Sequence, residues 1–195
     1  MAYPLLAENT DAMEEVKVRK NREAKEMLFE ELFSTYRDRV YYIARRYANN
    51  AEDALDLVQE IFIKAYCSLD TVKNAGNYGA WLYRIAVNHC IDKVRRKRLN
   101  ELSYEEISKN GGGAVASSAV VPLEGVSGNE LRAKVLDLVE ELSPEHRAVL
   151  LLHCMENLPY KQIARIMRCS VGTVMSRLHY ARKYLRRAML ASAII

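Results

Sequence analysis

Glycine and proline are scarce in this 195-residue chain, which contains eight glycines and four prolines. Both residues interrupt regular helices, so long stretches without them favour helical structure. Runs rich in Leu, Ala, Glu, Lys and Arg point the same way. No strand signal of any weight appears, which argues against a sheet. The sequence therefore predicts an all-α fold.

Cysteines are few, and their spacing fits neither a metal site nor a disulfide framework. The four cysteines, Cys67, Cys90, Cys154 and Cys169, include no CxxC pair, and the last two lack the paired histidines of a zinc finger. Free thiols are typical of a reducing compartment. We expect no metal site and no cofactor.

Long apolar runs are also absent. The longest, near residues 148–152, is far shorter than the roughly 20 residues that a helix needs to span a bilayer. Residues 1–15 have neither the basic start nor the apolar run of a signal peptide. No nucleotide-binding loop, metal site or catalytic triad is recognisable. We expect a cytoplasmic protein that is not an enzyme.

The spacing of apolar residues divides the chain into two helical parts with a break between them. Residues 22–100 and 130–190 are helical in pattern, and each predicts a small domain. Residues 1–21 are charged and weakly patterned, which indicates a flexible extension. Residues 101–129 contain the triple glycine 111–113 and predict a flexible linker.

Several helix starts carry recognisable capping residues. Asn50 stands before two acidic residues and predicts an N-cap. Ser143 followed by Pro144 is typical of an N-cap with proline at the first helical position. Pro159 and Ser170 mark two further starts.

The segment 160–185 predicts a helix-turn-helix with its turn at Arg168 and Cys169. The second helix offers one row of hydrogen-bonding groups to a DNA major groove. This row is Thr173, Ser176, Arg177, Tyr180 and Lys183. From Lys161 onward the chain contains no Asp or Glu, so phosphates would be attracted to it. The alternative is a basic, solvated helical hairpin without a ligand.

The helix after Asn50 carries an acidic stripe. Its polar members are Asp53, Asp56, Gln59 and Glu60. Such a stripe, mixed with apolar residues, suits a basic partner helix. The alternative is an ordinary solvated acidic face.

The segment 81–98 combines aromatic, amide and basic side chains. Trp81 and Tyr83 can pack in a core or stack on bases, and Asn88 can bond a base edge. The cations that can pair with phosphates are Arg84, Lys93, Arg95, Arg96 and Lys97. Aromatics interleaved with cations are what single-stranded nucleic acid needs. Trp81 is as compatible with the core as with DNA.

These segments, in this order, resemble the extracytoplasmic-function group of the sigma-70 family of RNA polymerase sigma factors. Residues 51–62 resemble region 2.2, residues 81–88 resemble regions 2.3 and 2.4, and the helix-turn-helix with Val171–Val174 resembles region 4. The resemblance covers roughly residues 25–100 and 130–188. It implies a subunit that binds core polymerase, reads duplex DNA at the −35 element and melted DNA at the −10 element, and is controlled by an anti-sigma factor.

The resemblance implies that Asp56, Gln59 and Glu60 dock on the polymerase, that the loop 70–78 with Asn88 holds a flipped −10 base, and that Thr173, Ser176 and Arg177 lie at the −35 groove. Together with the residue patterns above, it predicts three sets of site residues. The polymerase-binding set is Asp53, Asp56, Gln59 and Glu60. The −10 set is Asn74, Asn77, Trp81, Arg84, Asn88, Lys93, Arg95 and Arg96. The −35 set is Thr173, Met175, Ser176, Arg177, Tyr180 and Lys183.

Two positions depart from the family's pattern. Met175 stands where relatives commonly have Lys or Arg, and Arg168 stands where many helix-turn-helix turns have Gly. Two other classes of protein stay open as alternatives. One is a conventional helix-turn-helix regulator with an N-terminal sensing or dimerisation domain, and the other is a helical scaffold that binds no nucleic acid.

Overall fold

The computed structural model describes residues 5–72, 78–107 and 128–192, and the side chains within 17–72, 78–100 and 131–192. All regular structure in these ranges is helical, which confirms the all-α prediction. The elements are α1 (Leu5–Arg45), α2 (Ala51–Ser68), the 3₁₀ helix η1 (Leu69–Thr71), α3 (Tyr78–Ile107), α4 (Gly128–Glu140), α5 (Pro144–Cys154), α6 (Tyr160–Met167) and α7 (Val171–Ala191). None of the described helices is both long and apolar enough to cross a membrane.

Local capping chemistry sets several of the helix starts. The side chain of Asn50 accepts a hydrogen bond from the Asp53 N–H at 2.7 Å. The hydroxyl of Ser170 accepts one from the Thr173 N–H at 3.0 Å. Pro144 opens α5 directly after Ser143, whose side chain makes no capping hydrogen bond to the backbone. The three predicted starts are confirmed, with side-chain caps at Asn50 and Ser170.

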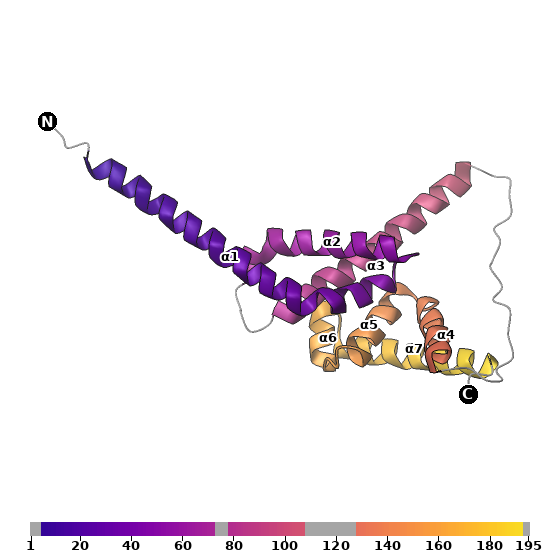
Figure 1. Cartoon of the computed structure of the whole chain (residues 1–195). Coiled ribbons are helices and arrows are strands. Elements are labelled where there is room, and N and C mark those ends of the chain that lie inside the picture. The colour runs from indigo at the N-terminus through magenta and orange to yellow at the C-terminus, as the bar shows by residue number, and fades with distance from the viewer. Residues whose placement is uncertain (1–4, 73–77, 108–127, 193–195) are drawn as a thin grey trace.

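Helix α1 begins at Leu5, inside the segment 1–21 for which the sequence indicated a flexible extension. Neither Gly nor Pro occurs within α1, so nothing in the backbone interrupts it. Ion pairs one turn apart, Arg19 with Glu23 and Arg22 with Glu26, support the helix where few other contacts exist. The first half of α1 projects away from the remaining helices (Figure 1).

Helices α1, α2 and α3 enclose one hydrophobic cluster. Val40 from α1, Ile61 from α2 and Leu82 from α3 have no solvent exposure. Burying a side chain of this kind contributes about 1.5–3 kcal/mol. This three-helix core holds the exposed faces of α2 and α3 in fixed relative positions.

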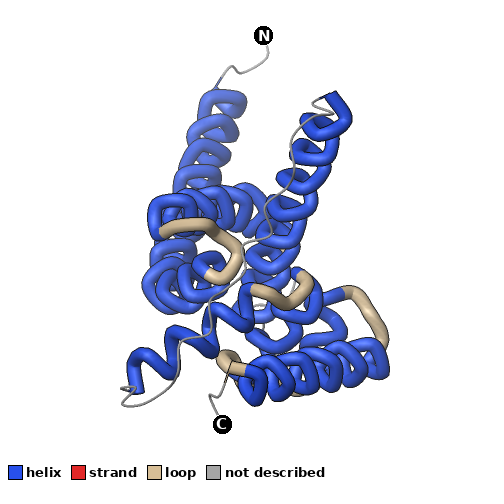
Figure 2. The backbone as a smooth tube through the Cα atoms, turned by 90° about the vertical axis from the view of Figure 1, so that its right-hand side faces the viewer, coloured by secondary structure: helices blue, strands red, loops and turns tan. Residues whose placement is uncertain are grey.

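A second hydrophobic cluster joins the two halves of the chain. It contains Tyr83, Val87 and Ile91 of α3 together with residues of α4–α7, among them Leu152 and Ile163. Helix α3 contacts α5 and α6 directly. Figures 1 and 2 place the C-terminal helices together against one side of the N-terminal bundle. The two domains therefore share a core, a feature for which we found no signal in the sequence.

Candidate nucleic-acid interface and docking surface

The exposed face of α2 mixes acidic, amide and apolar groups. Asp56 and Gln59 are exposed, and two large apolar neighbours, Leu55 and Ile63, are 53% and 63% exposed. Asp53 is half-buried and accepts a hydrogen bond from the Asn49 amide at 3.1 Å. Apolar groups of this size in solvent, beside a carboxylate, suit a protein partner better than water.

Glu60, the fourth residue of the predicted stripe, is bonded to α3. Its carboxylate accepts from Lys93 at 3.1 Å and lies 2.6 Å from Nε2 of the buried His89. The Lys64 ammonium lies 2.6 Å from Nδ1 of the same ring, so the neutral tautomer with its proton on Nε2 satisfies both partners. The Lys93 hydrogen bond is the main cause that lowers the pKa of Glu60. Glu60 therefore links α2 to α3.

The expected −10 contact residues Trp81, Arg84 and Asn88 lie on one face of α3, and all three are half-buried. Trp81 packs partly against the first core, and its ring meets the Tyr78 ring edge to face at 6.4 Å. Asn88 has no hydrogen-bond partner among the described residues. An amide placed this way is available to a ligand.

Other residues of the −10 set have partners within the protein. Lys93 pairs with Glu60, and Arg95 pairs with Glu145 of α5 at 3.4 Å. Arg96 is exposed. Asn74 and Asn77 lie outside the described residues.

Tyr83, which the sequence allowed to stack on bases, is only 3% exposed. Its hydroxyl donates to Glu156, and burial is the main cause that raises its pKa. Tyr83 is therefore a core residue in this arrangement and is not available to a base.

Helices α6 and α7 form the predicted helix-turn-helix. Between them Arg168 adopts a left-handed backbone with φ of 50°, and the Cys169 N–H donates to the Ala164 carbonyl at 3.0 Å. A glycine would adopt this conformation without strain. Arg168, which stands where many such turns have glycine, is held in it by the Cys169 hydrogen bond and by the packing of the two helices. Val174 and Leu178 bury the inner side of α7.

The outward face of α7 carries Ser176, Tyr180 and Lys183, all exposed. Thr173 is half-buried, and its hydroxyl lies 2.9 Å from the Ser170 hydroxyl as part of the helix cap. Arg177 is half-buried near α5. Burial is the main cause that lowers the pKa of His146 there, and the positive charge of Arg177 lowers it further. The residues predicted to contact the −35 element therefore do not share one exposed face. Ser176, Tyr180 and Lys183 are exposed, whereas Arg177 lies against α5.

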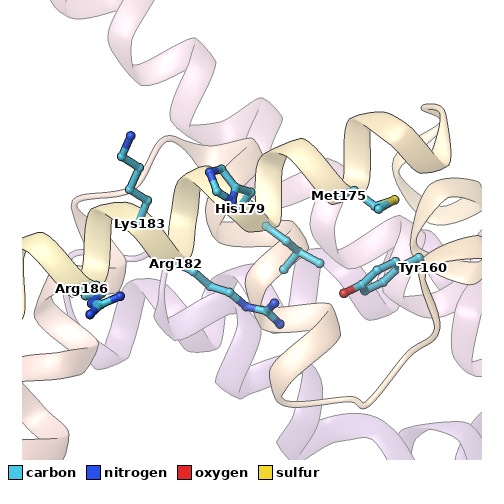
Figure 3. A pocket seen from close by; sticks show the side chains of 7 residues that line it. Tyr160, Met175, His179, Arg182, Lys183 and Arg186 are labelled. Atoms are coloured by element: carbon cyan, nitrogen blue, oxygen red, sulfur yellow. The ribbon is translucent and has the colours of Figure 1, made fainter.

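Met175 lies beside this outward face of α7, in a groove of about 380 Å³ (Figure 3). The groove is lined by Tyr160, Met175, Leu178, His179, Arg182, Lys183 and Arg186. Three of these, His179, Arg182 and Arg186, were not among the −35 contact residues expected from the sequence, although the two arginines belong to its acid-free basic segment. Their spacing from Met175 follows the helical repeat, so the sequence could have placed them on the same side of the helix as Met175.

Comparison with known families identifies both halves of the chain. The Sigma-70 region 2 model matches residues 32–99, and the Sigma-70, region 4 model matches residues 132–185. The fold and its two matched regions define a sigma factor of RNA polymerase.

Individual relatives show to which group of sigma factors the chain belongs. The chain is 30% identical over 165 residues to the ECF RNA polymerase sigma factor SigW of Bacillus subtilis, covering 83% of this chain and 88% of that protein. It is 32% identical over 174 residues to the ECF RNA polymerase sigma-E factor of Escherichia coli K12, covering 87% and 91%. The chain therefore belongs to the extracytoplasmic-function group of the sigma-70 family.

Solved structures agree in fold. The sigma factor RpoE in complex with the anti-sigma factor NepR from Bartonella quintana matches with a TM-score of 0.64 at 25% identity, covering 82% of this chain and 94% of that chain. CnrH in complex with the cytosolic domain of CnrY matches with a TM-score of 0.60 at 23% identity, covering 84% and 88%.

Proposed function

We propose that this protein binds core RNA polymerase and directs it to promoters through a −10 and a −35 element. The observation that carries the proposal is the helix-turn-helix of α6 and α7, whose sequence from Lys161 onward has no acidic residue. It is joined to a three-helix domain with an aromatic and basic face. A basic helix with exposed hydrogen-bonding groups gains affinity from phosphates and specificity from base edges.

We assign polymerase docking to the exposed face of α2. Asp56 and Gln59 supply charge and hydrogen bonds, and Leu55 and Ile63 supply apolar area. A basic partner helix would complement this face. Glu60 contributes by holding α2 against α3, in addition to its own charge.

We assign the −10 contact to the half-buried face of α3. Extruding a base from a duplex costs a few kcal/mol, which a pocket must offset with stacking and hydrogen bonds. Trp81 supplies a ring, Arg84 a charge and Asn88 an amide with spare hydrogen-bonding capacity. This combination fits a separated strand better than duplex DNA.

We assign the −35 contact to the outward face of α7 and to the groove beside it. Ser176, Tyr180 and Lys183 face outward, and Arg182 adds charge from the groove. Met175, 54% exposed, offers only apolar contact, for example to a thymine methyl group.

Control by an anti-sigma factor is part of the proposal, because the solved relatives RpoE and CnrH are each bound to a second protein, which for RpoE is an anti-sigma factor. Each activity proposed here is binding, so we propose that the protein acts without catalysing a reaction of its own. It would work in the cytoplasm, alongside the polymerase.

Reconstitution with purified core polymerase tests the proposal. We expect a stoichiometric complex on gel filtration and specific transcription from a promoter that core polymerase alone does not use. A helix-turn-helix regulator would instead bind duplex DNA on its own and leave core polymerase unbound. That result would favour the alternative class over a sigma factor.

A further inference from the structure

Four bonded side chains join α2 to α3 beside the exposed face of α2 that we assign to polymerase docking. Glu60 and Lys64 are four residues apart on α2, and His89 and Lys93 are four residues apart on α3. Each pair therefore lies on one side of its helix. The side chains are linked in the order Lys64, His89, Glu60 and Lys93. We call these four residues the polar bridge.

His89 is the buried member of the polar bridge, with only 6% of its surface exposed. Its Nε2 lies 2.6 Å from the Glu60 carboxylate, and its Nδ1 lies 2.6 Å from the Lys64 ammonium. An ammonium group can only donate hydrogen bonds, so Nδ1 has to accept one. Only the neutral imidazole can do this, and the observed arrangement therefore fits one protonation state of His89.

The charges that act on this imidazole come from both helices of the bridge. Burial is the main cause that lowers the pKa of His89 below its usual 6.5. The Lys64 and Lys93 charges lower it further, and Glu60 opposes the shift. Among the described residues, α1 places no hydrogen-bond partner on the ring. His89 is therefore neutral at neutral pH and takes up a proton only below about pH 6.5.

A proton on Nδ1 changes the bonding of the whole bridge. The nitrogen becomes a donor, so it can no longer accept from Lys64, and the charged ring repels the ammonium. Lys64 is exposed and can move into solvent. The imidazolium pairs with Glu60, whose carboxylate already pairs with Lys93. The Glu60 carboxylate then has two cations as partners inside the protein.

The state of Glu60 matters to the docking face because the same side chain belongs to both. Its side chain is 42% exposed, and it follows Gln59 on α2 one turn after Asp56. A basic partner helix is attracted by the negative charge of this face. Protonation of His89 adds one positive charge beside Glu60 and releases Lys64 from the ring. Both changes weaken the attraction.

We propose that His89 is a positioning residue of the docking face: its neutral imidazole leaves Glu60 available to core polymerase, and its protonation withdraws Glu60 and weakens docking. The inference rests on the proposed function, because it assigns proton sensitivity to that same docking. Polymerase binding and proton binding oppose each other, since coupling between two ligands is reciprocal. The affinity therefore falls as the pH drops through the folded pKa of His89.

The first experiment follows the titration of His89 in the full-length protein. Imidazole NMR signals recorded from about pH 8 to pH 5 report each histidine, and His89→Gln identifies the His89 signal. Lys64→Met removes the ammonium and should raise the pKa of His89, whereas Glu60→Gln should lower it. Lys20→Met, at an exposed position on α1, is the matched control and should leave this pKa unchanged. An unchanged pKa in Lys64→Met would contradict the polar bridge.

The second experiment measures binding to core polymerase at about pH 7.5 and pH 5.5 with constant ionic strength. The affinity of the wild-type protein should fall about threefold more than that of His89→Gln. The glutamine amide can still donate to Glu60 and accept from Lys64, so the bridge is kept without its titrating group. Comparing the two proteins also removes the titration of the polymerase itself. His89→Gln with the full pH dependence of the wild-type protein would overturn the proposal.

Two controls separate positioning from a merely structural role. His153→Gln, the same change at a half-buried position of α5, should keep the pH dependence of the wild-type protein. Circular dichroism over the same pH range should show intact helices. A loss of helices in step with the loss of affinity would assign the effect to unfolding and overturn the inference.

Lys64→Met tests the inference without replacing the histidine. Because its His89 has a raised pKa, the loss of affinity should begin at a higher pH than in the wild-type protein. A midpoint equal to that of the wild-type protein would contradict the proposal. If the wild-type protein binds polymerase but no part of the pH dependence belongs to His89, the inference fails and the proposed function stands. If no form binds core polymerase at any pH, the proposed function fails and the docking role of His89 fails with it.

Discussion

At the scale of single residues, some of the side chains in the proposed binding sites already have hydrogen-bond or ion-pair partners within the protein, and others do not. Glu60, Lys93 and Arg95 have partners inside the molecule. Asn88 has none among the described residues, although it is half-buried. The half-buried amide keeps contact with solvent in the free protein, so its hydrogen-bonding capacity is available to a ligand.

Asn88→Ala should impair promoter opening far more than initial binding, because the amide meets its base only after the strands separate. The protein loses no internal hydrogen bond, so we expect the free energy of unfolding to change by less than about 0.5 kcal/mol. Permanganate footprinting of the −10 strands and gel-shift binding on duplex DNA separate the two steps. Asn100→Ala, an exposed amide on the same helix, is the control. Normal strand opening by Asn88→Ala would remove the residue from the −10 set.

Arg168→Gly should stabilise the protein by about 1 kcal/mol, because a left-handed backbone costs about that much for a residue with a Cβ. The helical control is Arg165→Gly at an exposed position within α6, where glycine should destabilise by about 1 kcal/mol. Urea unfolding measures both. The same sign of change in the two variants would be inconsistent with the turn geometry described here.

At the scale of the elements, α2 and α3 are joined by titratable groups. Burial is the main cause that lowers the pKa of His89 below its usual 6.5, although the Glu60 hydrogen bond opposes the shift. The folded state therefore binds the proton more weakly than the unfolded state. Stability is complete above about pH 6.5 and falls as the pH drops from there towards the folded pKa. Burial lowers the pKa of His146 in the same direction, in the other domain.

His89→Gln should reduce the loss of stability between about pH 6.5 and pH 5, because the titrating group is gone while a polar side chain remains. Thermal unfolding at several pH values measures the slope. His146→Gln should remove the second contribution independently. An unchanged slope in the double variant would mean that other groups cause the acid sensitivity.

The exposed face of α2 gives a separate prediction. Asp56→Lys with Gln59→Lys should abolish binding to core polymerase and leave unfolding nearly unchanged, because both positions are exposed. Glu60→Lys should lower the melting temperature as well, because it breaks the bonds to His89 and Lys93. Glu30→Lys, an exposed acid on α1, controls for charge. Full polymerase binding by the double variant would exclude this face.

The elements that the sequence predicted well are those set by short-range chemistry. The Asn50 and Ser170 caps and the limits of α6 follow from residues within one turn of each other. The partners of Glu60 were not predictable in this way, because His89 and Lys93 are about 30 residues away and reach it only after α2 and α3 have packed. Helical spacing identified the acidic stripe of α2. Tertiary packing decided which of its residues bond to α3 and which remain exposed to a partner.

At the scale of the whole molecule, the division into two domains was visible in the composition, but their contact was not. Arg147 directly precedes the apolar run 148–152, and its three carbonyl partners include Arg46, about a hundred positions earlier in the chain. No local pattern encodes such a pair. The same contact joins the two halves, each with a proposed DNA-binding face, into one unit with a shared core. Cutting the connection between the halves tests whether this core holds them together.

Cleavage between α3 and α4 should leave the two halves associated. A specific protease site inserted after Gly112 allows complete cleavage without relying on the local conformation. Because the halves share buried apolar side chains and the Arg147 and Arg46 contacts, we expect the fragments to co-elute on gel filtration at the position of the uncut protein. Arg147→Ala, which leaves three carbonyls without their donor, should weaken the association, and fragments bearing it should separate on dilution. Immediate separation of the parent fragments would show that the shared core does not hold the domains together in solution.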